Sequence, residues 1–230
     1  MKQVISLGIV LGRTDFGEAD RILTVITPDQ GKLRLIAKGV RRAKSKMAGG
    51  VELFSISQIT YIPGRGEIGT LVSARLKDHY GKIVRDIKRT MYGYEVLKVV
   101  SKSTEDEVGC EYFDLVATAL ASLDNYDLPI EYTALWFDIR LLGLTGHLPN
   151  LRTDAQGKRL EQSKKYGLVP QDMVFVEQQD GQYEADHIKL LRLASSIEAP
   201  VTLLQVNGTD RVIGQCSSLA RQMRQFFISA

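Results

Sequence analysis

The chain has 230 residues, of which 44% are hydrophobic and 25% are charged, a composition typical of one large or two small globular domains. No apolar run reaches the roughly 18 residues of a membrane-spanning helix. The N-terminal stretch lacks a signal-peptide pattern, so we expect a cytoplasmic protein that has no membrane partner. Cys110 and Cys216 lie far apart in the sequence, which argues against a disulfide framework or a cysteine metal site.

The formal net charge of +3 conceals an uneven distribution along the chain. Residues 1–80 contain 13 Lys and Arg against 7 Asp and Glu, whereas residues 81–230 contain 17 against 20. Such a difference indicates that one module meets an anionic polymer and that the other has a different task. The N-terminal third is therefore the part that we expect to bind nucleic acid.

Short strands separated by turn signals are predicted throughout the first 80 residues. In residues 4–11, Ile5, Leu7, Ile9 and Leu11 alternate and predict one apolar face. Residues 21–26 and 32–38 are joined by the turn TPDQG and predict a hairpin. Further strands are expected at residues 53–62, with a bulge, and at 68–76. About five short strands without an intervening helix favour a small closed barrel, with an OB-like barrel as the leading candidate.

From His79 onward the apolar residues recur at every third or fourth position, which predicts helices. The expected helices cover residues 80–101 (with Ile83, Ile87, Met91 and Tyr94 on the apolar face), 112–123, 130–144, 187–197 and 212–228. Residues 150–183 are polar and rich in turns, so we expect loops with a short hairpin near residues 173–176. The prediction is an α+β chain with a five-stranded OB-fold barrel at 1–79 and an α-helical domain at 80–230, which carries a loop-rich insert at about 150–185.

Residues 27–50 contain the densest run of positive charge in the chain. Its basic residues are Lys32, Arg34, Lys38, Arg41, Arg42, Lys44 and Lys46, against the single acid Asp29. Lys and Arg side chains along an extended backbone each displace a counterion from a nucleic-acid strand, so this stretch is predicted to bind phosphates without reading the base sequence. Arg13 and Arg65 extend the surface if their loops lie on the same side. The simpler alternative is a solvated charged face.

Aromatic residues that stack on bases are few in the basic module. Before Tyr80 the candidates are Phe16, Phe54 and Tyr61, and the last two are expected in the core. Binding should therefore depend more on charge than on stacking.

The sequence offers little support for an enzyme or a cofactor. Residues 64–69 match the spacing GxGxxG, but the following TLVSARL is typical of a strand, whereas a dinucleotide site needs a helix there. His79, His147 and His187 are widely separated and show no metal-ligand spacing. No nucleophile, Walker or CxxC motif is present. We expect no catalytic residues, no metal and no cofactor.

Two alternative functions remain open at this stage. Asp15, Glu18 and Asp20 form an acidic cluster that would hold a divalent ion in a metal-dependent nuclease, although partnership with Arg13 and Arg21 is the more usual role for such acids. An RNA-binding OB-fold protein in translation or ribosome assembly would share the basic barrel.

The N-terminal sequence also carries specific pieces of a known family, namely GEADRI and GKLRLIAKGVRR, with a looser match at LLGLTGHLP. With these pieces the chain resembles the RecO family of bacterial recombination mediators. The resemblance implies an OB-fold barrel joined to an α-helical domain. It also implies binding of single- and double-stranded DNA, annealing of complementary strands, and loading of RecA together with RecR and single-strand-binding protein. The helical domain would then be the partner surface, with Arg140 and Arg221 or Arg224 at the rim of a groove for the acidic, aromatic-ended tail of single-strand-binding protein.

One segment departs from the RecO pattern. Many family members carry a four-cysteine zinc ribbon after the third helix, whereas the corresponding residues 153–157 here read TDAQG. Thr and Gln side chains cannot supply the thiolates of a structural zinc site. We therefore expect the insert to be a degenerate ribbon that folds without metal.

Overall fold

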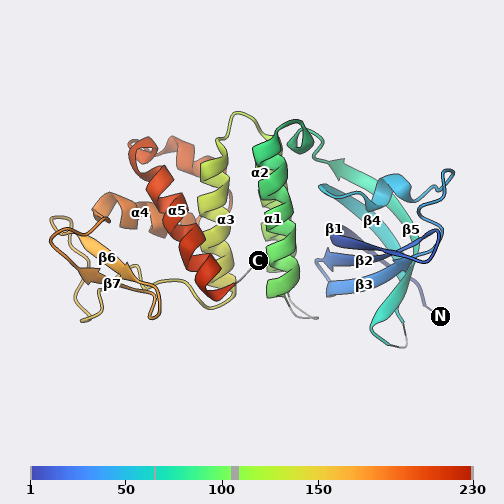
Figure 1. Ribbon diagram of the computed structural model, residues 1–230, viewed down its shortest axis with the longest axis horizontal. Helices are drawn as coiled ribbons and strands as arrows, with labels where there is room; N and C mark the ends of the chain where they lie inside the picture. Colours follow the sequence, from blue (N-terminus) through green and yellow to red (C-terminus); the bar gives the residue numbers. More distant parts are fainter. Residues whose placement is uncertain (1, 65, 105–108, 229–230) are drawn as a thin grey trace. The chain divides into compact units, whose positions relative to one another are not determined.

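The computed structural model describes residues 2–64, 66–104 and 109–228 of the chain. The chain forms two compact units, the first ending at Asn125 and the second beginning at Tyr126. In Figure 1 the first unit runs from blue to green and the second from yellow-green to red. Strands dominate the start of the first unit and helices the rest of the chain, so the predicted α+β class is confirmed.

Five strands close into a barrel in the first unit. They are β1 (Val4–Phe16), β2 (Asp20–Thr27), β3 (Gly31–Ala37), β4 (Ser55–Ile62) and β5 (Ile68–His79). Their order around the barrel is β1-β2-β3-β5-β4, and all neighbours are antiparallel except β3 and β5. The short 3-10 helix η1 (Ala48–Val51) precedes β4 and η2 (Ile83–Arg85) follows β5. This arrangement is the predicted OB-like barrel.

Alternating apolar residues of the strands fill the barrel interior. Leu23 of β2 lies opposite Leu35 of β3, and both side chains are buried together with Val25, Ile59 and Tyr61. Burial of these side chains removes apolar surface from water and is the main force that closes the barrel.

The inward face of β1 differs from its predicted face. Ile5 is 63% exposed and Leu7 is also exposed, whereas Ser6 and Gly8 are buried. A Cβ atom on Gly8 would lie 2.8 Å from Cγ1 of Val25, so only a very small residue fits there. A register shift between Val10 and Gly12 then changes the alternation along the strand. The prediction that Ile5, Leu7, Ile9 and Leu11 form one apolar face is therefore wrong, because Ile9 and Leu11 are buried and Ile5 and Leu7 are exposed.

Two helices complete the first unit: α1 (Ile87–Ser103) and α2 (Cys110–Asp124). The side chain of Asp86 accepts a hydrogen bond from the backbone N–H of Arg89 and so begins α1 seven residues later than predicted. The buried face of α1 carries Tyr92, Val96 and Val100, while Ile87, Met91 and Tyr94 are exposed. Apolar residues lie on two adjacent stripes of this helix, so spacing alone did not identify the buried one, and the predicted apolar face was wrong in this part.

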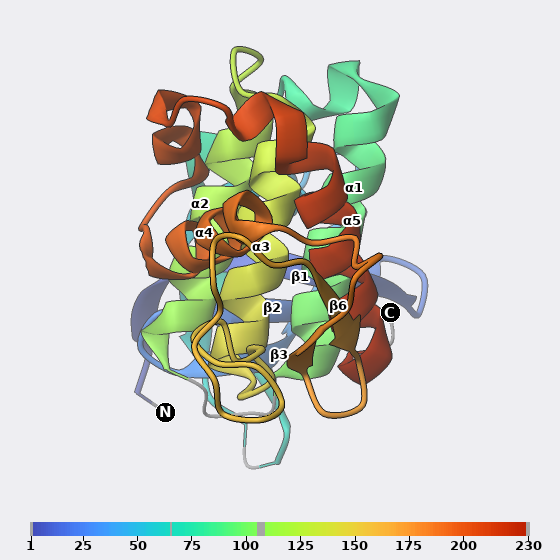
Figure 2. The same ribbon diagram turned by 90° about the vertical axis from the view of Figure 1, so that its left-hand side faces the viewer.

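The second unit is built around α3 (Ile130–Leu144), which is apolar on nearly all sides and largely buried. The helices α4 (Ala185–Ser196) and α5 (Thr209–Phe227) and the 3-10 helix η3 (Pro200–Gln205) pack against it. Figure 2 shows this unit toward the viewer, in yellow to red. The helices predicted at 187–197 and 212–228 are present and begin two to three residues earlier.

The loop-rich insert between α3 and α4 contains the predicted hairpin, formed by β6 (Tyr166–Val169) and β7 (Val174–Glu177). Before the hairpin, the buried carboxylate of Asp154 accepts hydrogen bonds from the backbone N–H groups of Gln156 and Lys158, each 2.9 Å long. The hydroxyl of Tyr166 accepts one from the N–H of Glu161 at 2.7 Å. Side-chain acceptors thus organise the loops of the insert.

Candidate nucleic-acid interface

The basic loop, residues 38–46, connects β3 to η1 and lies against the turn of the β1–β2 hairpin, residues 17–19. The N–H of Arg41 donates to the carbonyl of Ala19 at 2.9 Å, and the N–H of Gly39 donates to the Asp20 carboxylate at 2.7 Å. Gly17 and Gly39 both adopt positive φ angles, +56° and +66°, which a side chain would strain. The backbone of the two loops is therefore joined at a defined position.

Four cations of the basic loop extend into solvent. Lys38, Arg42, Lys44 and Lys46 are exposed, and the described residues place no carboxylate within ion-pair distance of them. Nothing in that part of the chain competes with a phosphate for these four side chains. They are the predicted site residues whose geometry best suits contact with a nucleic-acid backbone.

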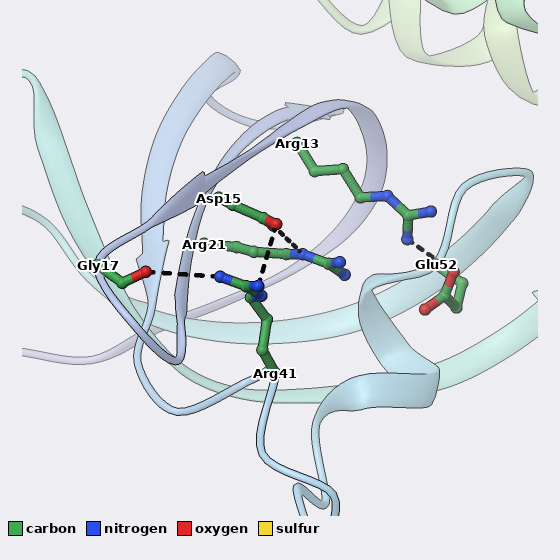
Figure 3. Close-up of polar contacts among 6 residues, drawn as sticks. All are labelled: Arg13, Asp15, Gly17, Arg21, Arg41 and Glu52. Atoms are coloured by element: carbon green, nitrogen blue, oxygen red, sulfur yellow. Dashed lines mark hydrogen bonds and ion pairs between the residues drawn. The ribbon is translucent and has the colours of Figure 1, made fainter.

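A cluster of arginines and acids occupies the hairpin beside the basic loop (Figure 3). Oδ1 of Asp15 accepts a hydrogen bond from Nε of Arg21 at 2.8 Å, and its Oδ2 lies 3.4 Å from Nη2 of Arg41. Arg13 is bound by Glu52 at 2.7 Å. The hydrogen bond from Arg21, followed by the positive charges of Arg41, Arg21 and Arg13, holds the pKa of Asp15 below its ordinary value. Arg13 and Arg41 are thus already paired with carboxylates.

These contacts also bear on the nuclease alternative. Asp15 binds arginines and Asp20 binds the backbone of Gly39, so two of the three acids hold protein groups instead of a shared ion. Over residues 2–64, 66–104 and 109–228, no group of three His, Cys, Asp or Glu side chains has the geometry of a metal site. Within the acidic cluster, Asp15 is the partner of nearby arginines, and Asp20 holds the backbone of the basic loop.

The remaining predicted residues of the surface are placed differently. Lys32 donates through Nζ to the carbonyls of Ser101, at 3.2 Å, and Thr104, at the C-terminal end of α1. Arg34 lies 3.6 Å from Glu67. Both belong to β3, whose far end leads into the basic loop. Lys32 therefore links α1 to the barrel. Arg65, the last predicted residue of this surface, lies outside the described residues.

The three arginines predicted for partner binding do not share one rim. Arg224 is 0% exposed, and its Nε lies 2.7 Å from Oδ1 of the equally buried Asp138, so its predicted place at a groove rim is wrong. Arg140 is half-buried and donates to the carbonyl of Ser195 at 3.0 Å, near the end of α4. Arg221 is exposed on α5. The structure places Arg224 one helical turn after Ala220, on the buried face of α5, and its partner Asp138 lies 86 residues away in the sequence.

A groove does lie in the second unit, between the β6–β7 hairpin and α5. Its volume is about 410 Å³. The apolar residues that line it are Leu168, Pro170, Tyr183, Leu219, Met223 and Phe226. Sequence reasoning missed all of these, because they come from three separated segments that only the fold brings together.

Comparison with protein families adds evidence independent of this geometry. A model described as "Recombination protein O N terminal" matches residues 1–80, and one described as "Recombination protein O C terminal" matches residues 84–219. The chain belongs to the RecO family. The first RecO model thus ends with β5, and the second covers α1 to most of α5.

Curated relatives of this RecO-family chain are named DNA repair protein RecO. That of Dehalococcoides mccartyi is 32% identical over 145 residues, covering 63% of this chain and 56% of the relative. That of Rhodopirellula baltica is 30% identical over 162 residues, covering 69% and 60%, and that of Heliobacterium modesticaldum is 31% identical over 143 residues, covering 62% and 51%. The chain therefore spans about half to three fifths of the length of these RecO proteins. Within its described residues, no helix is both long and apolar enough to cross a membrane.

Proposed function

We propose that this RecO-family chain is a non-enzymatic recombination mediator that binds single- and double-stranded DNA and anneals complementary strands. It acts in the cytoplasm on the nucleoid and, with RecR and single-strand-binding protein, helps to load RecA onto covered single strands. The observation that carries the proposal is the basic loop, which projects from an OB-like barrel of a family named for DNA repair and recombination. Its exposed cations Lys38, Arg42, Lys44 and Lys46 have no carboxylate within ion-pair distance among the described residues.

Annealing requires no covalent chemistry, so the mechanism follows from electrostatics. Two complementary strands repel each other through their phosphates, and cations that neutralise some of these charges allow the strands to approach. Lys38, Arg42, Lys44 and Lys46 contact phosphates and leave the base edges free to pair. Their contacts are exposed to solvent and individually weak, so a strand exchanges partners readily.

The test is annealing of complementary oligonucleotides covered by single-strand-binding protein, followed across salt concentration. The variant Arg42→Ala/Lys44→Ala/Lys46→Ala removes three exposed charges of the basic loop. Its matched control, Lys88→Ala/Lys98→Ala/Lys102→Ala, removes three exposed charges from α1. We expect slow annealing in the loop variant only. The slope of log affinity for single strands against log salt should fall by about 2, at about 0.7 per lost phosphate contact.

Two outcomes contradict the proposal. If the wild type neither binds nor anneals DNA at low salt, the basic loop is a solvated face. If an RNA of the same sequence displaces the DNA with clear preference, the barrel reads the 2′-hydroxyl and the chain is an RNA-binding protein.

For the helical unit, we propose that the groove beside α5 receives the acidic, aromatic-ended tail of single-strand-binding protein. Support comes from the apolar side chains of its lining, which include Met223 and Phe226. A tail peptide should bind Phe226→Ala more weakly than the wild type. Arg221→Ala, an exposed arginine of α5 that is not part of the groove lining, serves as the control. Equal affinity in all three proteins would remove this groove as the site.

A further inference from the structure

Phe16 is an exposed aromatic residue at the end of β1. Its side chain is 52% exposed, whereas the other aromatic residues of the barrel, Phe54 and Tyr61, are 3% and 2% exposed. Phe16 is not part of the hydrophobic core of the barrel, and about half of its surface remains open to a flat apolar ligand.

The hairpin turn holds this ring in a defined place. Phe16 pairs with Asp20 across the turn, and the Asp20 carboxylate is bound by the N–H of Gly39. Arg41 donates through its backbone to Ala19 at 2.9 Å and through Nη1 to the carbonyl of Gly17 at 3.5 Å. The residues on either side of the turn are thus tied to the basic loop, so little backbone entropy is lost when a ligand covers the ring.

The positive charge around the ring favours a ligand that carries phosphates. Arg41 contacts the residue that follows Phe16, and Arg42 and Lys44 extend the positive charge along the same loop. A strand whose phosphates lie on the basic loop therefore brings its bases near the phenyl ring. In OB-folds the β1–β2 loop commonly borders the nucleic-acid site, and aromatic rings there stack on bases of any identity.

We propose that Phe16 stacks on an unpaired base of single-stranded DNA whose phosphates are held by the basic loop. Because bases inside a duplex already stack on each other, this contact exists only with the single strand. Phe16 thereby gives the chain a preference for unpaired DNA that phosphate contacts alone cannot provide. This inference rests on the proposed DNA-binding function and adds a determinant of strand preference to it.

The test compares Phe16→Leu, which keeps an apolar side chain but removes the ring, with Phe16→Tyr, which keeps the ring. The affinity of each for a single strand and for a duplex is measured across salt concentration. For Phe16→Leu we expect single-strand binding to weaken roughly 5- to 150-fold, the range for loss of one stacked base. Duplex affinity and the salt slope should be unchanged, and Phe16→Tyr should bind as the wild type does.

A direct readout comes from Phe16→Trp, since the only native tryptophan, Trp136, is 2% exposed and gives a constant background. Its added fluorescence should be quenched by a single strand and not by a duplex. Unchanged single-strand affinity in Phe16→Leu, or an equal loss for single strand and duplex, would overturn the inference while leaving DNA binding by the basic loop intact. Failure of the wild type to bind any DNA would overturn both.

Discussion

In the basic loop of the first unit, Arg42, Lys44 and Lys46 extend into solvent, whereas in the second unit Arg224 is fully enclosed and lies 2.7 Å from Asp138. Lys32 is intermediate, because it leaves the strand that precedes the loop and ends on carbonyls of α1. All of these residues look alike in the sequence. A cation stabilises the fold where a carboxylate or backbone carbonyls lie within hydrogen-bond distance of it. It remains available to a ligand where neither kind of acceptor is near.

The largest effect on stability should appear when a structural cation loses the acid with which it is paired. Asp138→Ala removes the acid from a fully buried ion pair with Arg224, so the free energy of unfolding of the second unit should fall by about 3–5 kcal/mol. Denaturant unfolding followed by the fluorescence of Trp136, which lies on the same helix as Asp138, measures this. The double change Asp138→Leu/Arg224→Met should cost clearly less. If the free energy of unfolding fell by less than about 1 kcal/mol in Asp138→Ala, the buried ion pair would not be the structural element that we describe.

Lys32 provides a second contrast within the barrel unit. Lys32→Met keeps the apolar stem but removes the donor to the α1 carbonyls, so the free energy of unfolding should fall by about 1.5–3 kcal/mol. Lys44→Met should change it by less than about 0.5 kcal/mol. The salt slope of DNA binding should show the reverse pattern. It should fall in Lys44→Met, which removes a phosphate contact, and stay constant in Lys32→Met. Denaturation measures the change in stability of the two variants, and binding titrations measure their salt slopes. A lower salt slope in Lys32→Met would show that Lys32 contacts DNA.

Asp15 provides a further test, because its carboxylate pairs with Arg41 of the basic loop and with the neighbouring Arg21. Asp15→Asn releases Arg21 and Arg41, so single-strand affinity should rise about 2- to 10-fold, as expected for the loss of exposed ion pairs. Asp78→Asn removes the same charge from β5 and should have little effect. Because its arginine contacts lower the pKa of Asp15, the difference from the wild type should persist as the pH falls to the ordinary Asp value of about 3.9 and vanish only below the lowered pKa. An unchanged affinity at pH 7 would show that the phosphates do not use these arginines.

The smallest effect on stability is expected from changes at the two cysteine thiols. Cys110 is exposed and Cys216 is buried, and burial raises the pKa of the Cys216 thiol to about 12. Alkylation at neutral pH, read by mass spectrometry, should therefore modify Cys110 and spare Cys216 until the chain unfolds. The stability that the buried neutral thiol contributes should be complete below the unfolded pKa of about 8.5 and decline as the pH rises toward 12. Cys216→Ala should show a shallower alkaline decline, and rapid alkylation of Cys216 in the folded chain would contradict its burial.

The sequence by itself determined the barrel followed by helices, the hairpin in the insert and the position of the basic loop. These features follow from local signals, namely alternation of period two, spacing of three to four, and glycines and prolines at turns. It also placed Phe54 and Tyr61 in the core, because they lie in strongly apolar surroundings.

The tertiary structure alone decided which charges are free. Lys32 meets carbonyls 69 and 72 residues away, and Arg224 meets an acid 86 residues away, so no local pattern reports these contacts. The inward face of β1 was likewise decided by the close approach of Gly8 to Val25, and the buried stripe of α1 by its packing on the rest of the first unit. In each case the deciding term is the burial of a group against a distant partner, and that partner is defined only once the chain has folded.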